Sequence, residues 1–249
     1  MKEFGVGVTL DYAWGFTKKH FLPMVGMLLL LILAYYAFEY LFMAVFGMAS
    51  FTAGLEAIRT NPKDSVEVLT NLLIAAAPAM CAYTVCMSAV STVLYNAYVN
   101  LALRLADGTK TGVDFSCFKL PLMTYVKVFF ASLLTSVMVC IGLSLCILPG
   151  IFVLVRLIFV CIALIDDPEL SFFDAFQKSW QMTKGYFWSL LLLGIMIVLI
   201  VIAGLCCCCV GVLVSVVIEV FALAVAYVIL SGKPLADHSC CTQCESQEA

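Results

Sequence analysis

The sequence predicts an all-α integral membrane protein, a polytopic bundle of six transmembrane helices arranged as three hairpins. Three observations predict this fold class: six long apolar runs, too few polar residues to coat a soluble globule, and basic residues that lie almost entirely on one side of the runs. Hydrophobic residues make up 64% of the chain and charged residues 12%, and the mean hydropathy is +1.11. Because lipid cannot satisfy exposed backbone groups, we expect each long run to be a helix.

The bilayer thickness sets the predicted spans, since a helix needs roughly 20 apolar residues to cross the hydrocarbon core. We predict a single domain, 1–249, with a cytoplasmic tail at 231–249. Its spans lie at about residues 21–43, 72–94, 128–145, 147–165, 186–205 and 210–230. Pro149 and Gly150 are expected to break the chain between the third and fourth spans. These two spans are close to the minimum length, so a shallow re-entrant hairpin is the alternative for them.

Lysine and arginine residues predict the orientation, because positive charge is retained on the cytoplasmic face during insertion. Ten of them fall on one side of the spans: Lys2, Lys18, Lys19, Arg104, Lys110, Lys119, Lys127, Lys178, Lys184 and Lys233. The other side has Arg59 and Lys63, and Arg156 falls inside the fourth span. We therefore expect both termini in the cytoplasm. The first apolar run is too long for a cleaved signal peptide and is expected to be retained.

A short motif recurs where odd-numbered spans begin. Trp, Thr, Lys and Phe occur at equal spacing in residues 14–21 and 180–187, and Lys127 with Phe130 repeats the Lys-x-x-Phe interval before the third span. The recurrence indicates three hairpins on one plan, each entered through a basic, aromatic segment on the cytoplasmic face. Chance similarity is the alternative.

The segment before the fifth span predicts an interfacial amphipathic helix. The run 166–168 (Asp-Asp-Pro) should end the fourth helix, Ser171 should cap a new one, and Gly185 should end it. The aromatic residues of this helix share one face: Phe172, Phe173, Phe176 and Trp180. We expect a similar helix at the N-terminus, on Leu10, Ala13, Trp14, Thr17 and Phe21. Simple anchoring at the interface is the alternative to lipid recognition.

Ionisable residues inside the spans form a candidate intramembrane polar site. Arg156 and Glu219 are predicted at similar depth in the fourth and sixth spans, and Glu39 lies near the outer end of the first. Charges in the membrane usually face the bundle interior and pair, so we expect an Arg156–Glu219 ion pair, with Glu39 as the alternative partner. The pair would either fix which helices touch or form a substrate or ion site.

A second candidate site would bind lipid headgroups. Asn96, Asn100 and Arg104 repeat at helical spacing, and arginine and amide donors suit phosphate oxygens. Ordinary emergence of the helix into the headgroup region is the simpler alternative. The juxtamembrane residues of the repeated motif complete the candidate set: Lys18, Lys184, Trp14 and Trp180.

Cysteines and histidines indicate no catalytic or cofactor site. Most of the 13 cysteines lie in or beside spans, where a thiol behaves as a small apolar group. In the tail, His238, Cys241 and Cys244 are half a zinc site at most, and a flexible polar tail is the alternative. We expect no metal site, no cofactor and no enzyme activity, because no nucleophile–histidine pairing, phosphate loop or metalloprotease motif is present. No basic cluster suggests nucleic acid.

Several landmarks resemble a bacterial family of uncharacterised polytopic proteins related to the membrane domain of glycerophosphoryl diester phosphodiesterases. They are the Asp-Gly at 107–108, the Leu-Pro-Gly-Ile at 148–151 with Arg156-Leu157, the Asp-Asp at 166–167, and Ser179-Trp180 with Thr-Lys-Gly at 183–185. The resemblance covers about the latter two-thirds of the chain. It implies a six-helix bacterial inner-membrane protein, whereas the phosphodiesterase activity and the cysteine-rich segments lie outside it.

The expected role is non-enzymatic. We expect an accessory or scaffold protein of the bacterial cytoplasmic membrane that contacts lipid headgroups, another membrane protein or a second copy of itself through its cytoplasmic aromatic segments. A transporter or flippase for a small or lipidic substrate is the alternative, using Arg156, Glu219 and the stripe from Asn96 to Arg104.

Overall fold

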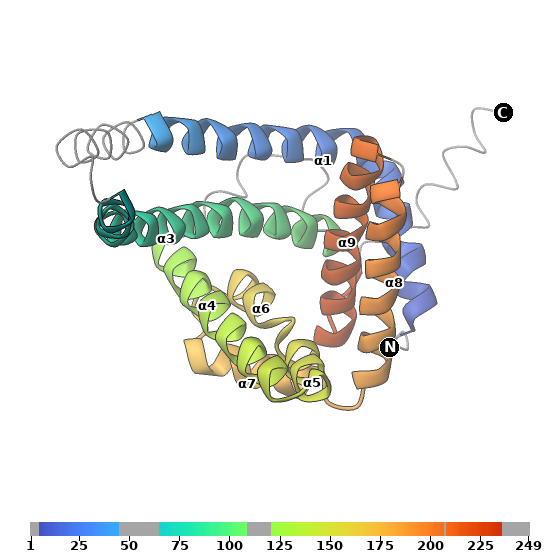
Figure 1. Cartoon of the computed structure of the whole chain (residues 1–249). Coiled ribbons are helices and arrows are strands. Elements are labelled where there is room, and N and C mark those ends of the chain that lie inside the picture. Colours follow the sequence, from blue (N-terminus) through green and yellow to red (C-terminus); the bar gives the residue numbers. More distant parts are fainter. Residues whose placement is uncertain (1–4, 45–64, 109–120, 207, 236–249) are drawn as a thin grey trace. The chain divides into compact units, whose positions relative to one another are not determined.

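The chain folds into helices. The computed structural model describes residues 5–44, 65–108, 121–206 and 208–235, and no strand occurs within these ranges. The helices are α1 (Val6–Phe42), α3 (Ser65–Ala106), α4 (Leu122–Leu145), α5 (Ile147–Leu157), α6 (Val160–Asp166), α7 (Phe172–Met182), α8 (Phe187–Cys206) and α9 (Cys208–Ser231) (Figure 1). The predicted all-α class is confirmed.

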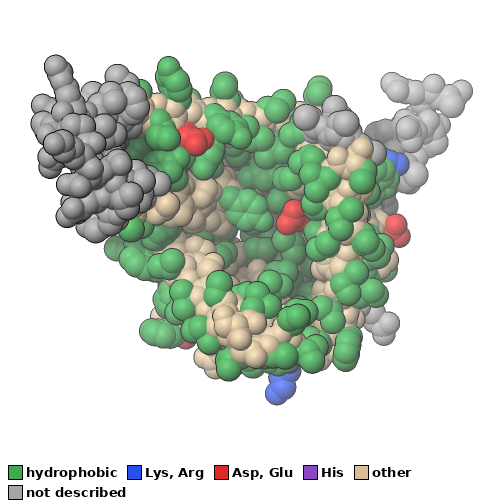
Figure 2. All heavy atoms as spheres, viewed as in Figure 1, with side chains coloured by type: hydrophobic (Ala, Val, Ile, Leu, Met, Phe, Trp, Pro, Cys, Tyr) green, Lys and Arg blue, Asp and Glu red, His purple; other side chains and the backbone are tan. Residues whose placement is uncertain are grey.

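Six helical segments are long and apolar enough to cross a bilayer. They are Val6–Phe42, Tyr83–Ala106, Leu122–Leu145, Ile147–Asp166, Phe187–Cys206 and Gly211–Ser231. Figure 2 shows hydrophobic side chains over most of the visible face, with few charged groups between them. Each predicted span therefore has a helical counterpart, and the surface suits a multi-pass protein surrounded by lipid.

The helix breaks differ in part from the prediction. The third and fourth spans separate at Cys146, whose backbone is extended, and Pro149 lies in the first turn of α5. The expected break at Pro149 and Gly150 was therefore wrong. Proline is tolerated there because the first-turn N–H groups have no partner inside the helix. Within α1, His20 has non-helical backbone angles (φ −113°, ψ 19°), which separates residues 6–19 from the predicted first span.

The chain divides into two compact units, Met1–Leu28 with Tyr95–Ala249, and Leu29–Leu94. In the larger unit, α4 packs against α5 and α6, α7 packs against the same two helices, and α8 packs against α9. In the smaller unit, the Tyr83 hydroxyl of α3 donates a hydrogen bond to Glu39 of α1 at 3.2 Å, and Tyr83 also contacts the Phe42 ring. The prediction of a single domain stays a prediction.

The second helix of each hairpin is the more buried one. Within the six apolar windows, 61% of the α9 window is buried and 44% of the windows in α3 and in α5–α6, against 17% for α1, α4 and α8. Phe221 and Tyr227 of α9 are fully buried, and Phe159 before α6 contacts the Tyr227 ring. Within the larger unit, α9 is therefore more buried than α8, and α5–α6 is more buried than α4.

Glycines allow two of the hairpins to close tightly. A Cβ atom on Gly142 of α4 would lie 2.9 Å from the Gly150 Cα of α5. A Cβ atom on Gly204 of α8 would lie 2.7 Å from the Gly211 carbonyl oxygen of α9. Small residues at such crossings let helix backbones approach closely, as is common between membrane helices.

Candidate functional site

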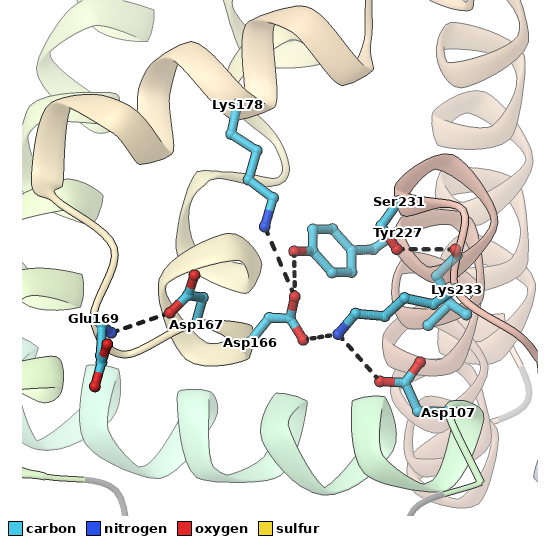
Figure 3. A network of polar contacts seen from close by, with 9 residues as sticks. Asp107, Asp166, Asp167, Glu169, Lys178, Tyr227, Ser231 and Lys233 are labelled. Carbon is cyan, nitrogen blue, oxygen red and sulfur yellow. Dashed lines mark hydrogen bonds and ion pairs between the residues drawn. The ribbon is translucent and has the colours of Figure 1, made fainter.

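A polar network joins the ends of three helices in the larger unit. It consists of Asp107, Asp166, Lys178, Tyr227 and Lys233, and we call it the Asp166 network (Figure 3). Lys233 reaches between two carboxylates: it forms an ion pair with Asp166 and lies 3.6 Å from the Asp107 carboxylate. The Tyr227 hydroxyl donates a 2.8 Å hydrogen bond to Asp166, and the Lys178 ammonium lies 3.8 Å from the same carboxylate.

The network places the C-terminal ends of α3, α6 and α9 next to one another. Asp107 follows α3, Asp166 ends α6, and Lys233 follows α9. On the α4 side, Lys127 donates hydrogen bonds to the carbonyl oxygens of Pro168 at 3.0 Å and Leu170 at 3.1 Å. The charge pattern predicted that the ends of α3, α6 and α9 and the start of α4 lie on one membrane face, and in the structure these segments are close together. Which face of the membrane this is stays a prediction.

Burial changes the protonation equilibria of this network. It raises the pKa of Asp107 above its ordinary value, and the Asp166 charge adds to the rise while the Lys233 charge opposes it. For Lys233, partial burial lowers the pKa. Its hydrogen bond to Asp166 and the charges of both aspartates outweigh burial, so the pKa of Lys233 is raised. Two carboxylates and two ammonium groups leave the network balanced in charge at neutral pH.

Arg156 does not pair with Glu219, so the predicted ion pair was wrong. The Arg156 Nη1 atom lies 3.5 Å from the Trp180 carbonyl oxygen and 3.4 Å from the Thr183 hydroxyl oxygen, both at the C-terminal end of α7. The reason is that α7 packs back against α5, so the C-terminal end of α7 reaches the arginine. Counting residues along one straight helix placed Arg156 at mid-membrane and could not foresee this contact.

The two predicted acidic partners lie elsewhere. Glu219 is half-buried on α9. Glu39 accepts the hydrogen bond from Tyr83 within the smaller unit. The three residues of the candidate intramembrane site are therefore not joined by an ion pair among the described residues.

The stripe on α3 faces protein more than its surroundings. Asn96 and Asn100 are 4% and 2% exposed, and Arg104 is half-buried and donates a 2.9 Å hydrogen bond from Nε to the Asn100 side chain. Emergence into the headgroup region therefore does not describe the two asparagines, because their side chains are buried. The stripe's headgroup-binding role stays a prediction.

The two copies of the tryptophan motif occupy equivalent environments. Thr17 donates a 2.7 Å hydrogen bond to the Ala13 carbonyl, and Thr183 donates a 2.9 Å hydrogen bond to the Ser179 carbonyl. All four of these residues are buried. Each copy contains a backbone break, at His20 in one and at the positive φ of Gly185 in the other. The repeated sequence thus has the same local structure twice.

Each tryptophan of the motif is half-exposed beneath a cation. Trp14 is 47% exposed with the Lys18 ammonium 5.3 Å from its ring centroid, and Trp180 is 43% exposed with the Arg156 guanidinium at the same distance. Lys184 is also exposed. We call these places the α1 corner (Trp14, Lys18) and the α8 corner (Arg156, Trp180, Lys184). Exposed indole and basic groups at the start of a span are typical of a membrane interface.

The predicted helix before the fifth span is present as α7. It begins after Ser171 as expected, but the Ser171 side chain forms no cap hydrogen bond. Ala175 and Ser179 form its buried face, and Ser179 donates a 2.8 Å hydrogen bond to the Arg156 carbonyl. Phe173 is 77% exposed. The aromatic face is therefore partly free to meet lipid or another protein.

The predicted metal ligands of the tail, His238, Cys241 and Cys244, lie outside the described residues. Within residues 5–44, 65–108, 121–206 and 208–235, no group of three or more histidine, cysteine, aspartate or glutamate residues is arranged to hold a metal ion.

Sequence reasoning missed the Asp166 network. Asp107 and Asp166 were noted as landmarks of a resemblance, and Lys233 only as a positive charge. The sequence did contain one indication of the network: two different spans end at an aspartate, and a third is followed by a lysine. Three spans that end on one face can bring such groups together.

No protein-family model, curated protein or solved structure matches the chain. The family resemblance therefore stays a prediction.

Proposed function

We propose that the protein is a non-enzymatic accessory or scaffold protein of the bacterial cytoplasmic membrane that engages lipid headgroups at its α1 and α8 corners. The observation that supports this proposal is that both motif tryptophans are half-exposed with a cation 5.3 Å from the ring centroid. The cation is Lys18 of the motif itself in one copy and Arg156 of α5 in the other. Indole rings prefer the interface, and lysine and arginine attract the phosphates of anionic lipids. One tryptophan with a cation over its ring would be an ordinary membrane anchor, whereas two of them provide two places for lipid headgroups to bind.

Lipid retention tests the proposal. The protein is extracted in a mild uncharged detergent, and the phospholipid that co-purifies is measured per mole of protein. We expect bound anionic phospholipid in the wild type and less in Trp14→Ala/Lys18→Gln, because that pair removes both the interfacial ring and the cation. Lys19→Gln, a neighbouring exposed lysine, is the matched control and should retain wild-type lipid. Wild-type protein that carries no phospholipid would contradict the proposal.

A transporter or flippase is the second candidate, and Glu219 favours it. A half-buried carboxylate in the sixth span is costly in a membrane, and such groups often mark proton or ion pathways. Proteoliposomes with a fluorescent phospholipid test this role: a flippase should move the lipid between leaflets, and Glu219→Gln should slow that movement. If wild-type protein moves no more lipid than empty vesicles, flippase activity is contradicted.

A further inference from the structure

The guanidinium of Arg156 is held between two aromatic rings without a carboxylate. Its Cζ atom lies 5.1 Å from the Phe152 ring centroid and 5.3 Å from that of Trp180, and the two rings meet edge to face at 5.8 Å. Among the ion pairs of the described residues, none involves Arg156. The positive charge is therefore oriented by aromatic packing and is not neutralised by a neighbouring acid.

The hydrogen-bonding capacity of Arg156 is also largely unused. Guanidinium has five N–H donors, and the two contacts of Nη1, at 3.5 and 3.4 Å, are longer than ordinary hydrogen bonds. The Nε atom is buried and has no hydrogen-bond partner. A buried donor without a partner costs free energy of about 1–3 kcal/mol, and more for a charged group. The terminal Nη groups are suited to an anion that accepts hydrogen bonds from both of them together.

The surroundings of the arginine fix the chemistry of that anion. The Ser179 hydroxyl holds the Arg156 carbonyl at 2.8 Å, and Phe187, which begins α8, contacts the Phe152 ring at 5.4 Å. Trp188 is 78% exposed on the same turn of α8. The arginine thus lies where a predicted span begins, beside rings that prefer the membrane interface, and phosphate is the anion found at that depth.

We infer that Arg156 is the binding site for the phosphate of an anionic phospholipid, with the Phe152 and Trp180 rings holding the guanidinium in place. The inference rests on the proposed headgroup binding and assigns the ligand class at the α8 corner. Bidentate pairing of the two Nη groups with two phosphate oxygens supplies the missing negative charge. Lysine has a single compact charge and cannot reproduce this pairing.

A fluorescence titration tests the assignment. The full chain carrying Trp14→Phe and Trp188→Phe, which keeps Trp180 as its reporter, is titrated in uncharged detergent with phosphatidylglycerol or with inorganic phosphate. We expect saturable changes with the lipid and weaker binding of inorganic phosphate, since the acyl chains add apolar contact. Arg156→Gln should weaken lipid binding roughly tenfold or more. Arg156→Lys should bind the lipid more weakly than the wild type and more tightly than Arg156→Gln.

The outcomes separate this inference from the proposed function. Equal binding by wild type and Arg156→Gln would overturn the Arg156 site, while lipid retention that depends on Trp14 and Lys18 would still support headgroup binding. Inorganic phosphate that binds as tightly as the lipid would overturn the lipid assignment. Arg156→Lys keeps the charge, so it reports on pairing geometry even if Arg156→Gln does not fold.

Discussion

Asp166 receives polar contacts from α7 and from the C-terminal end of α9. Its side chain is only 9% exposed, and it accepts a hydrogen bond from Tyr227 and pairs with Lys178 and Lys233. A carboxylate in such a position is stabilised by its partners, and its partners depend on it in turn. The residue therefore holds helix ends together independently of any ligand.

Replacing Asp166 should destabilise the protein. Asp166→Ala leaves a buried tyrosine hydroxyl and the Lys178 ammonium without their acceptor and leaves Lys233 with Asp107 alone, so we expect a loss of about 2–3 kcal/mol in the free energy of unfolding. Thermal melting of the purified protein in detergent measures the change. Asp174→Asn, on the exposed side of α7, is the matched control and should stay within about 0.5 kcal/mol of wild type. Equal melting of the two variants would show that the network contributes nothing.

Lys233 should make stability depend on alkaline pH. Its pKa is raised above the ordinary 10.5 in the folded protein, so the folded state binds the proton more tightly than the unfolded state. The stabilising contribution is therefore complete below about pH 10.5 and is lost as the pH rises through the folded-state pKa. We expect the melting temperature to fall in this window, and to fall less in Lys233→Gln. The same slope in both proteins would contradict the assignment.

At the scale of elements, the helix hairpins depend on glycine contacts. Gly142 of α4 meets Gly150 of α5, and a methyl group on Gly142 would lie 2.9 Å from backbone atoms that cannot rotate away. We expect Gly142→Ala to destabilise the hairpin by about 1–3 kcal/mol, the usual cost of overpacking. Chemical unfolding in detergent measures it.

The control for that substitution is Gly194→Ala in α8. A Cβ atom at Gly194 would meet nothing within 4 Å, and alanine favours helix over glycine. We therefore expect no loss of stability. A loss as large as that of Gly142→Ala would mean that the effect comes from the helix itself and not from the contact between α4 and α5.

The sequence was sufficient to predict the spans because one physical length, the bilayer thickness, sets each of them. The repeated motif has one local feature in common in its two copies, since Thr17 and Thr183 each donate a hydrogen bond to the carbonyl oxygen four residues earlier. These features depend on residues near one another in the chain. The predicted bounds of the third and fourth spans left Cys146 between them, but no sequence pattern indicated its extended backbone, so the break was wrongly attributed to Pro149 and Gly150.

The partners of charged residues could not be predicted, because they depend on packing between distant segments. Arg156 meets residues 24 and 27 positions further along the chain only because α7 packs back against α5. Lys233 meets Asp166 across 67 positions. Hydrophobic periodicity describes how each helix faces its surroundings, and it contains no information on which charge lies opposite which.

In the whole molecule, the Asp166 network and both corners should lie on one membrane face. Thiol labelling on intact cells tests this most directly, using a cysteine-free background with either Cys206 restored or Glu169→Cys introduced. Cys206 ends α8, and Glu169 lies exposed between α6 and α7. An impermeant maleimide should label the Cys206 protein on intact cells, and the Glu169→Cys protein only after the membrane is opened. The reverse pattern would place the corners outside the cell and contradict the account.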